Sequence, residues 1–98
     1  MPAVCRGDSV DSDLTHCSTP KRDERSGNVF CNGTGISRQG DKNTSHKLPG
    51  APCPLHKAAI SKGSSTVFVN NKGCGRVGDG ITACTKVATG SKNVFAGG

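Results

Sequence analysis

A 16-residue pattern occurs twice in this 98-residue chain, and it constrains the fold more than any other feature. Residues 26–41 and 64–79 align without a gap. Both contain Ser, then Val-Phe, then Asn, and later Arg-x-Gly-Asp, with Phe and Asp 11 residues apart. A pattern that recurs in this way predicts repeated structural units that bury a core only when they pack together.

A third copy begins at residue 91 with Ser-Lys-Asn-Val-Phe and stops at the C-terminus. Joining the two termini places Asp8 11 residues after Phe95, the same separation as in the complete copies. We therefore expect residues 91–98 to be completed by residues 1–8, in a single domain spanning 1–98. The three copies would surround a pseudo-threefold axis, and residues near 92–97 would pair with residues near 2–6.

The dipeptides that follow the Val-Phe-x segments are typical of tight turns. They are Asn32-Gly33, Asn70-Asn71 and Gly97-Gly98. A two-residue type I′ turn requires positive φ at both central positions, which Asn and Gly tolerate best. Each copy is thus predicted to be a short strand, a turn and a second strand, which makes the fold class all-β.

The apolar content is too low for an ordinary core. Only 17 of the 98 residues are Val, Ile, Leu or Phe, and the formal net charge is +6. Small chains with so little apolar surface usually need a disulfide, a metal or a partner subunit. The 14 Gly and 5 Pro also disfavour helices. We therefore predict that a disulfide, a metal or a partner subunit stabilises the fold.

Side chains that bind metals occur at corresponding points of the three copies. His46 and Cys84 each follow the Asp of their own copy by five residues. His16 follows Asp8 by eight, with the three extra residues placed in the 9–15 stretch. Three equivalent side chains near a threefold axis can converge on that axis.

A fourth ligand is available from the segment between the second and third of these positions. His56 follows a Pro-rich excursion at 49–55 and could fold over the axis. Three imidazoles and one thiolate make a closed tetrahedral site that suits structural zinc. The predicted set for one Zn²⁺ is His16, His46, His56 and Cys84.

The remaining cysteines have different expected roles. Cys31 and Cys74 align with apolar residues of the other copies and are predicted to be small buried side chains. Cys5 aligns with Arg38 and Arg76 of the other copies. Cys17 and Cys53 lie next to or near His16 and His56, and each remains a rival for a histidine as ligand.

Several functions are disfavoured by the sequence. The N-terminus has no basic segment followed by an apolar one, which predicts synthesis in the cytoplasm without a signal peptide. The longest apolar runs have three residues, too few to span a membrane. No nucleophile, base and pocket occur together, so the chain is not expected to be an enzyme.

The repeated Ser-x-x-Val-Phe-x-Asn, followed by Arg-x-Gly-Asp, resembles the PAAR-repeat proteins. These form the tip of the membrane-piercing spike in contractile phage tails and type VI secretion systems. The resemblance covers the whole chain, including the circular split of the third copy. The tetrapeptide that names the family is replaced by residues 2–5, 35–38 and 73–76.

The resemblance implies a small cone of short strands with zinc near its apex, held by His16, His46, His56 and Cys84. It also implies a flat base on a homotrimeric β-helical spike, with one tip per trimer. The protein would assemble in a virion tail baseplate or a secretion spike, and it would contact the target membrane transiently without binding nucleic acid. The alternatives are a zinc-stabilised nucleic-acid-binding module and a secreted cationic disulfide protein.

Overall fold

The computed structural model describes residues 1–14, 19–44, 46–47, 55–82 and 84–97, with only the backbone described at 46–47 and 55–56. Six two-residue strands form three antiparallel pairs. These are β1 (Phe30–Cys31) with β2 (Thr34–Gly35), β3 (His46–Lys47) with β4 (Leu55–His56), and β5 (Phe68–Val69) with β6 (Lys72–Gly73). Ten isolated β-bridges join the segments between them.

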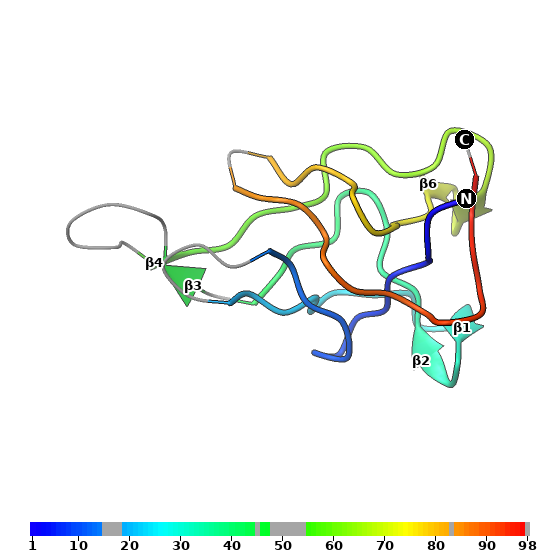
Figure 1. Ribbon diagram of the computed structural model, residues 1–98, viewed down its shortest axis with the longest axis horizontal. Helices are drawn as coiled ribbons and strands as arrows, with labels where there is room; N and C mark the ends of the chain where they lie inside the picture. The colour runs from blue at the N-terminus through cyan, green and yellow to red at the C-terminus, as the bar shows by residue number, and fades with distance from the viewer. Residues whose placement is uncertain (15–18, 45, 48–54, 83, 98) are drawn as a thin grey trace.

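No described residue lies in a helix, so the expected all-β class is confirmed. Accordingly, the described part of the chain contains no helix of the length and apolarity that a membrane crossing requires. The molecule is elongated, with principal extents of 39 × 23 × 22 Å. Figure 1 shows β1, β2, β6 and both termini at one end, and β3 and β4 toward the other.

The two complete hairpins have the predicted turns. Asn32 and Gly33 have φ values of 52° and 81°, and Asn70 and Asn71 have values of 52° and 66°. Positive φ at both central positions matches the right-handed twist of the flanking strands. The Asn side chains that favour this conformation thus set the register of β1 with β2 and of β5 with β6.

The two ends of the chain pair with each other, as predicted. Ala3 and Phe95 form an antiparallel bridge. The Val4 N–H donates to the Val94 carbonyl at 3.0 Å, and the Ala96 N–H donates to the Pro2 carbonyl at 3.0 Å. The terminal segments therefore occupy a place in the fold like that of a hairpin whose turn has been cut.

Three buried residues from distant parts of the sequence form a closed ring of backbone hydrogen bonds. The Cys5 N–H donates to the Gly75 carbonyl at 3.0 Å, Gly75 donates to Ser37 at 2.9 Å, and Ser37 donates back to Cys5 at 3.1 Å. A Cβ atom at position 75 would lie 2.5 Å from the Ser37 carbonyl oxygen. Glycine is therefore required where the three segments approach most closely.

The bridges next to this ring are cyclic as well. Each of three segments pairs an arginine with an apolar residue of another segment, and the three pairings close on themselves. They are Arg6 with Ile36, Arg38 with Cys74, and Arg76 with Val4. Every segment thus contacts both of the others, which explains how two-residue strands are held together.

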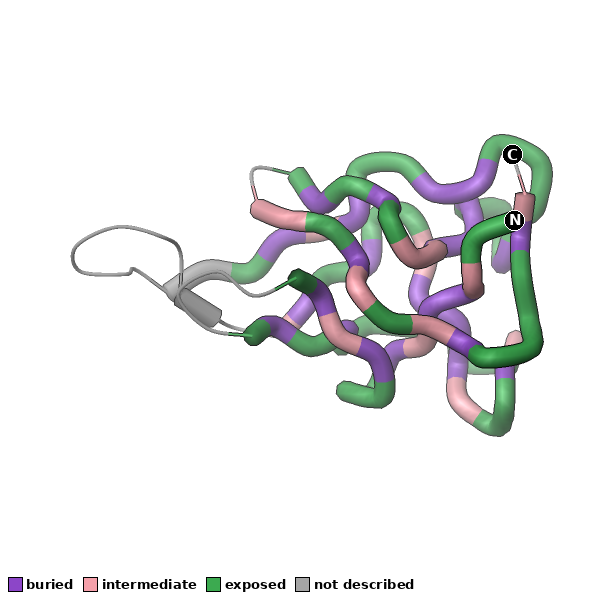
Figure 2. The backbone as a smooth tube through the Cα atoms, in the orientation of Figure 1, coloured by how far each residue is buried: buried purple, intermediate pink, exposed green. Residues whose placement is uncertain are grey.

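The buried apolar side chains form two clusters along the molecule. One cluster contains Val4, Cys31, Ile36, Val69, Cys74 and Ala96. The other contains Cys5, Ala58, Ile60, Ile81 and Val87. Buried and exposed residues alternate along much of the described chain (Figure 2), so neither cluster is large.

The expected burial of Cys31 and Cys74 is confirmed, because their residues are only 3% and 1% exposed. Burial raises the pKa of the Cys74 thiol to about 11, so this side chain stays a neutral, small apolar group at neutral pH. Cys5, Cys31 and Cys74 are free thiols.

Candidate metal centre and docking face

Three arginine–aspartate pairs lock the segments that surround the backbone ring. In each pair the Asp carboxylate accepts hydrogen bonds from the Arg guanidinium and from the same residue's backbone N–H. The pairs are Arg6–Asp11, Arg38–Asp41 and Arg76–Asp79. The hydrogen bond to the carboxylate raises the pKa of the Arg6 and Arg76 guanidinium groups. These carboxylates hold the local backbone.

The alignment of the first residues needs a correction. Asp8 was expected to correspond to Asp41, but it is Asp11 that accepts the equivalent backbone hydrogen bond. The residue that corresponds to Arg38 is Arg6, whereas the alignment had placed Cys5 there. Asp8 instead lies in a turn with φ of 51° and pairs with Arg25 at 2.9 Å. A Gly-Asp dipeptide occurs here by coincidence, and only the contacts of the carboxylates distinguish the two aspartates.

The corrected register makes the spacing of the candidate ligands uniform. His16 follows Asp11 by five residues, just as His46 follows Asp41 and Cys84 follows Asp79. No extra residues are then needed before His16. His16 itself lies outside the described residues, so this match is one of sequence spacing onto an observed carboxylate position.

Two of the candidate ligands lie directly opposite each other in the backbone. His46 in β3 and His56 in β4 are Cα partners in the antiparallel register. This pairing brings together two residues that are ten positions apart in the sequence. The backbone of His56 thus lies beside that of His46.

Cys84 is half-buried, and its thiol is held by neighbours. Its backbone N–H donates to the Ile81 carbonyl at 3.0 Å, and the Asn43 side-chain amide lies 3.9 Å from its sulfur. Burial raises the pKa of the Cys84 thiol, while the hydrogen bond from Asn43 acts in the opposite direction. Binding to a cation would favour the thiolate further.

Among the residues that the structure describes, no three His, Cys, Asp or Glu side chains form a metal-binding group. His16 and the rival ligands Cys17 and Cys53 lie outside those residues, and the side chains of His46 and His56 are not described. The zinc set therefore stays a prediction. The paired backbone of His46 and His56, the uniform spacing and the half-buried position of Cys84 all fit it.

One group of buried polar residues was not predicted. Arg22 and Asp13 form an ion pair with an Nε–Oδ1 distance of 3.1 Å, and both side chains are fully buried. Asn43, also fully buried, donates from Nδ2 to the second Asp13 oxygen at 3.0 Å. Sequence reasoning missed this cluster because charged residues are expected at the surface.

The end of the molecule that carries both termini exposes apolar side chains. Phe30, Phe68 and Phe95 are 59%, 60% and 50% exposed. They occupy matching positions. The strand partner of each phenylalanine directly precedes the apolar residue that forms a bridge with an arginine of another segment. The pairings are Phe30 with Gly35, Phe68 with Gly73, and Phe95 with Ala3. We call this surface, formed by residues 26–35, 64–73, 91–97 and 1–5, the docking face.

Three buried serines connect the segments of the docking face through hydrogen bonds. Each is buried, and its Oγ accepts backbone N–H groups from the second and third residues after it. Each hydroxyl also donates to a neighbouring segment. The contacts are Ser26 to Asn70 at 2.6 Å, Ser91 to Asn32 at 2.6 Å, and Ser64 to the Gly97 carbonyl at 2.5 Å. The three parts of the face are thus linked in a closed cycle.

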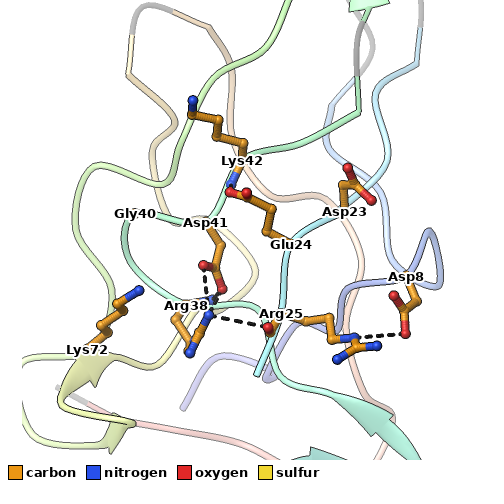
Figure 3. Close-up of a pocket in the computed structure, with 9 residues that line it drawn as sticks. All are labelled: Asp8, Asp23, Glu24, Arg25, Arg38, Gly40, Asp41, Lys42 and Lys72. Carbon is orange, nitrogen blue, oxygen red and sulfur yellow. Dashed lines mark hydrogen bonds and ion pairs between the residues drawn. The ribbon is translucent and has the colours of Figure 1, made fainter. Parts of the chain in front are cut away.

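The flank carries an open, strongly charged cavity of about 610 Å³ (Figure 3). Within it Arg25 pairs with Asp8 and Arg38 with Asp41, and Glu24 accepts the Lys42 backbone N–H at 2.7 Å. The lining contains no Ser, Cys or His. Its charged lining consists of carboxylates together with guanidinium and ammonium groups.

Comparison with known proteins gives no further assignment: no family model matches the chain, and no curated protein matches it.

Proposed function

We propose that the chain is a non-enzymatic, PAAR-like tip that caps and sharpens a homotrimeric β-helical spike. The observation that carries this proposal is the closed ring of backbone hydrogen bonds through Cys5, Ser37 and Gly75. An arginine–aspartate pair, a buried serine and an exposed phenylalanine each occur once in every one of the three segments around it. We infer three repeats about a pseudo-threefold axis, the third formed by residues 91–98 with the N-terminal segment.

A single chain can cap a threefold partner only when its own surface approximates threefold symmetry. The three exposed phenylalanines meet that condition, because each occupies the same place in its hairpin. Aromatic side chains of this kind are typical anchors of protein interfaces. The occupant we infer is therefore the end of a symmetric trimer.

The charge of the docking face is consistent with such a partner. All seven acidic residues of the chain lie outside residues 26–35, 64–73, 91–97 and 1–5. The charged side chains within these residue ranges are those of Lys72 and Lys92. We infer a partner end that is apolar and neutral or acidic.

At the opposite end, a bound metal would add the stability that the two small apolar clusters do not provide. His16, His46, His56 and Cys84 would hold one Zn²⁺ in a closed site, where it acts structurally. The chain's own residues prepare the site: β3 and β4 align His46 with His56, and Asn43 lies against Cys84. Axial force on a piercing tip requires that this end stays folded.

The proposal applies equally to the spike of a contractile phage tail and to that of a type VI secretion system. The nucleic-acid alternative is less well supported, since all five arginines form ion pairs with aspartates of the same chain. Phosphate binding by an arginine would have to displace such a partner.

Replacing Phe30, Phe68 and Phe95 together by Ala is expected to abolish binding to the trimeric spike while the tip stays folded. The side chains are half exposed, so their loss costs the monomer little, whereas an interface anchor contributes about 2–4 kcal/mol. The measurement is co-purification with a co-expressed trimeric β-helical spike.

A matched control is Leu14→Ala, because Leu14 is 49% exposed but lies outside the docking face. It should bind like the unchanged protein. Equal retention of the triple variant and the unchanged protein would contradict the assignment of this face.

A further inference from the structure

The fully buried cluster of Arg22, Asp13 and Asn43 breaks the approximate symmetry of the molecule. The Arg22 N–H donates to the Asp11 carbonyl at 2.8 Å. Ile60 and Val87 make the same contact with Asp41 and Asp79, at 3.2 and 3.1 Å. Apolar residues thus stand where this segment carries an arginine.

The position occupied by Asp13, the ion-pair partner of Arg22, also differs in polarity between the three repeats. Asp13, Asn43 and Ile81 occupy equivalent positions, because each N–H donates to the carbonyl of a matching residue. These bonds are Asp13 to Pro20 at 2.9 Å, Asn43 to Ala58 at 3.0 Å and Ile81 to Thr85 at 2.8 Å. A buried ion pair usually gives no more stability than apolar residues of similar size. What the cluster contacts is therefore a better guide to its role than stability.

The orientation of the Asn43 amide is fixed on both sides. Its Oδ1 accepts the Ala58 backbone N–H at 2.9 Å, and its Nδ2 donates to Asp13 Oδ2 at 3.0 Å. Since an ionised carboxylate only accepts hydrogen bonds, the NH₂ group must face Asp13. The other Asp13 oxygen, Oδ1, forms the ion pair with the Arg22 guanidinium.

The same Nδ2 has its second hydrogen directed at Cys84, with a nitrogen–sulfur distance of 3.9 Å. A sulfur that accepts an N–H hydrogen bond is stabilised as thiolate and restricted in rotation. Groups that orient a metal ligand in this way commonly change metal affinity by about 10- to 100-fold.

We propose that Asn43 is a positioning residue that holds the Cys84 sulfur for metal binding, and that Arg22 and Asp13 fix Asn43 in that orientation. This inference rests on the proposed role of Cys84 as a ligand. It assigns a function to a buried polar cluster in which Arg22 takes the place of Ile60 and Val87 of the other repeats.

The test compares Asn43→Ala with the unchanged protein in titrations with Zn²⁺ and with Co²⁺ as a spectroscopic probe. We expect Zn²⁺ affinity to fall about 10- to 100-fold and the sulfur-to-cobalt charge-transfer band to shift. Ser26→Ala is the matched control, because Ser26 is equally buried and hydrogen-bonded but belongs to the docking face. It should leave both readouts unchanged.

A measurement on the unchanged protein covers the case in which Asn43→Ala does not fold. In ¹¹³Cd²⁺-loaded, ¹⁵N-labelled protein, the Asn43 side-chain NH₂ should show scalar coupling to cadmium through the Cys84 sulfur. Absence of that coupling, or equal Zn²⁺ affinity in Asn43→Ala, would overturn the inference while leaving the metal site intact. An unchanged protein that binds neither Zn²⁺ nor Co²⁺ would overturn the proposed metal site as well.

Discussion

The purified protein is expected to contain one zinc per chain, and a chelator at neutral pH is expected to abolish its cooperative thermal transition. Structural zinc contributes about 10–16 kcal/mol of binding free energy in small domains. This is comparable to the whole stability of a typical domain, about 5–15 kcal/mol. With two small apolar clusters, the described chain has little else to hold the end that carries β3 and β4.

Cys84→Ser should reproduce the effect of the chelator, because a serine hydroxyl does not replace a thiolate ligand. Cys31→Val is the matched control: Cys31 is a buried free thiol whose equivalent in the second hairpin is Val69. It should retain zinc and its melting temperature. A metal-free protein with an unchanged melting curve would refute the zinc site.

The second large effect is expected from the buried ion pair. Arg22→Leu should lower the free energy of unfolding by about 3–5 kcal/mol, because it leaves the Asp13 carboxylate buried without its cation. The double variant Arg22→Leu with Asp13→Ile should recover most of this loss, since the residues equivalent to this pair in another repeat, Val87 and Ile81, are both apolar and lie in one buried cluster. Denaturant unfolding of the metal-loaded proteins, analysed as a double-mutant cycle, measures the coupling.

The exposed pair of Arg25 and Asp8 provides the control. Its side chains are 37% and 54% exposed, and Arg25→Leu should change stability by at most about 1 kcal/mol. Similar losses for Arg22→Leu and Arg25→Leu would contradict the role given to burial. Under the further inference, the double variant should fold and still bind zinc more weakly.

The strand pairing of this fold could be predicted because it depends on local and repeated signals. Asn32-Gly33 and Asn70-Asn71 set their turns through backbone conformation alone. The pairing of the termini followed from a pattern split between residues 91–98 and 1–8. Neither inference required knowledge of how the side chains pack.

Register and burial of single residues could not be predicted in the same way. Asp8 and Asp11 have the same side chain, and only the contacts of Arg6 show that its guanidinium pairs with Asp11. The phenylalanines would be placed in the core by hydrophobicity alone, yet Phe68 is 60% exposed. Arg22 and Asp13 would be placed at the surface by charge alone.

For the candidate metal site, the sequence indicated which residue types recur at equivalent points but not what surrounds them. The pairing of His46 with His56 depends on how β3 meets β4, across a segment with no repeat counterpart. Asn43 carried no motif at all. Its role emerges only from its contacts with Asp13 and Cys84.

The central claim is that one pseudo-threefold chain caps one homotrimer, and the mass of the complex tests it most directly. The tip should be co-expressed with a trimeric β-helical spike, and the purified complex measured by native mass spectrometry. We expect one tip per three spike chains, with no retention on DNA at physiological salt. Three tips per trimer, or salt-sensitive DNA binding in place of spike binding, would contradict it.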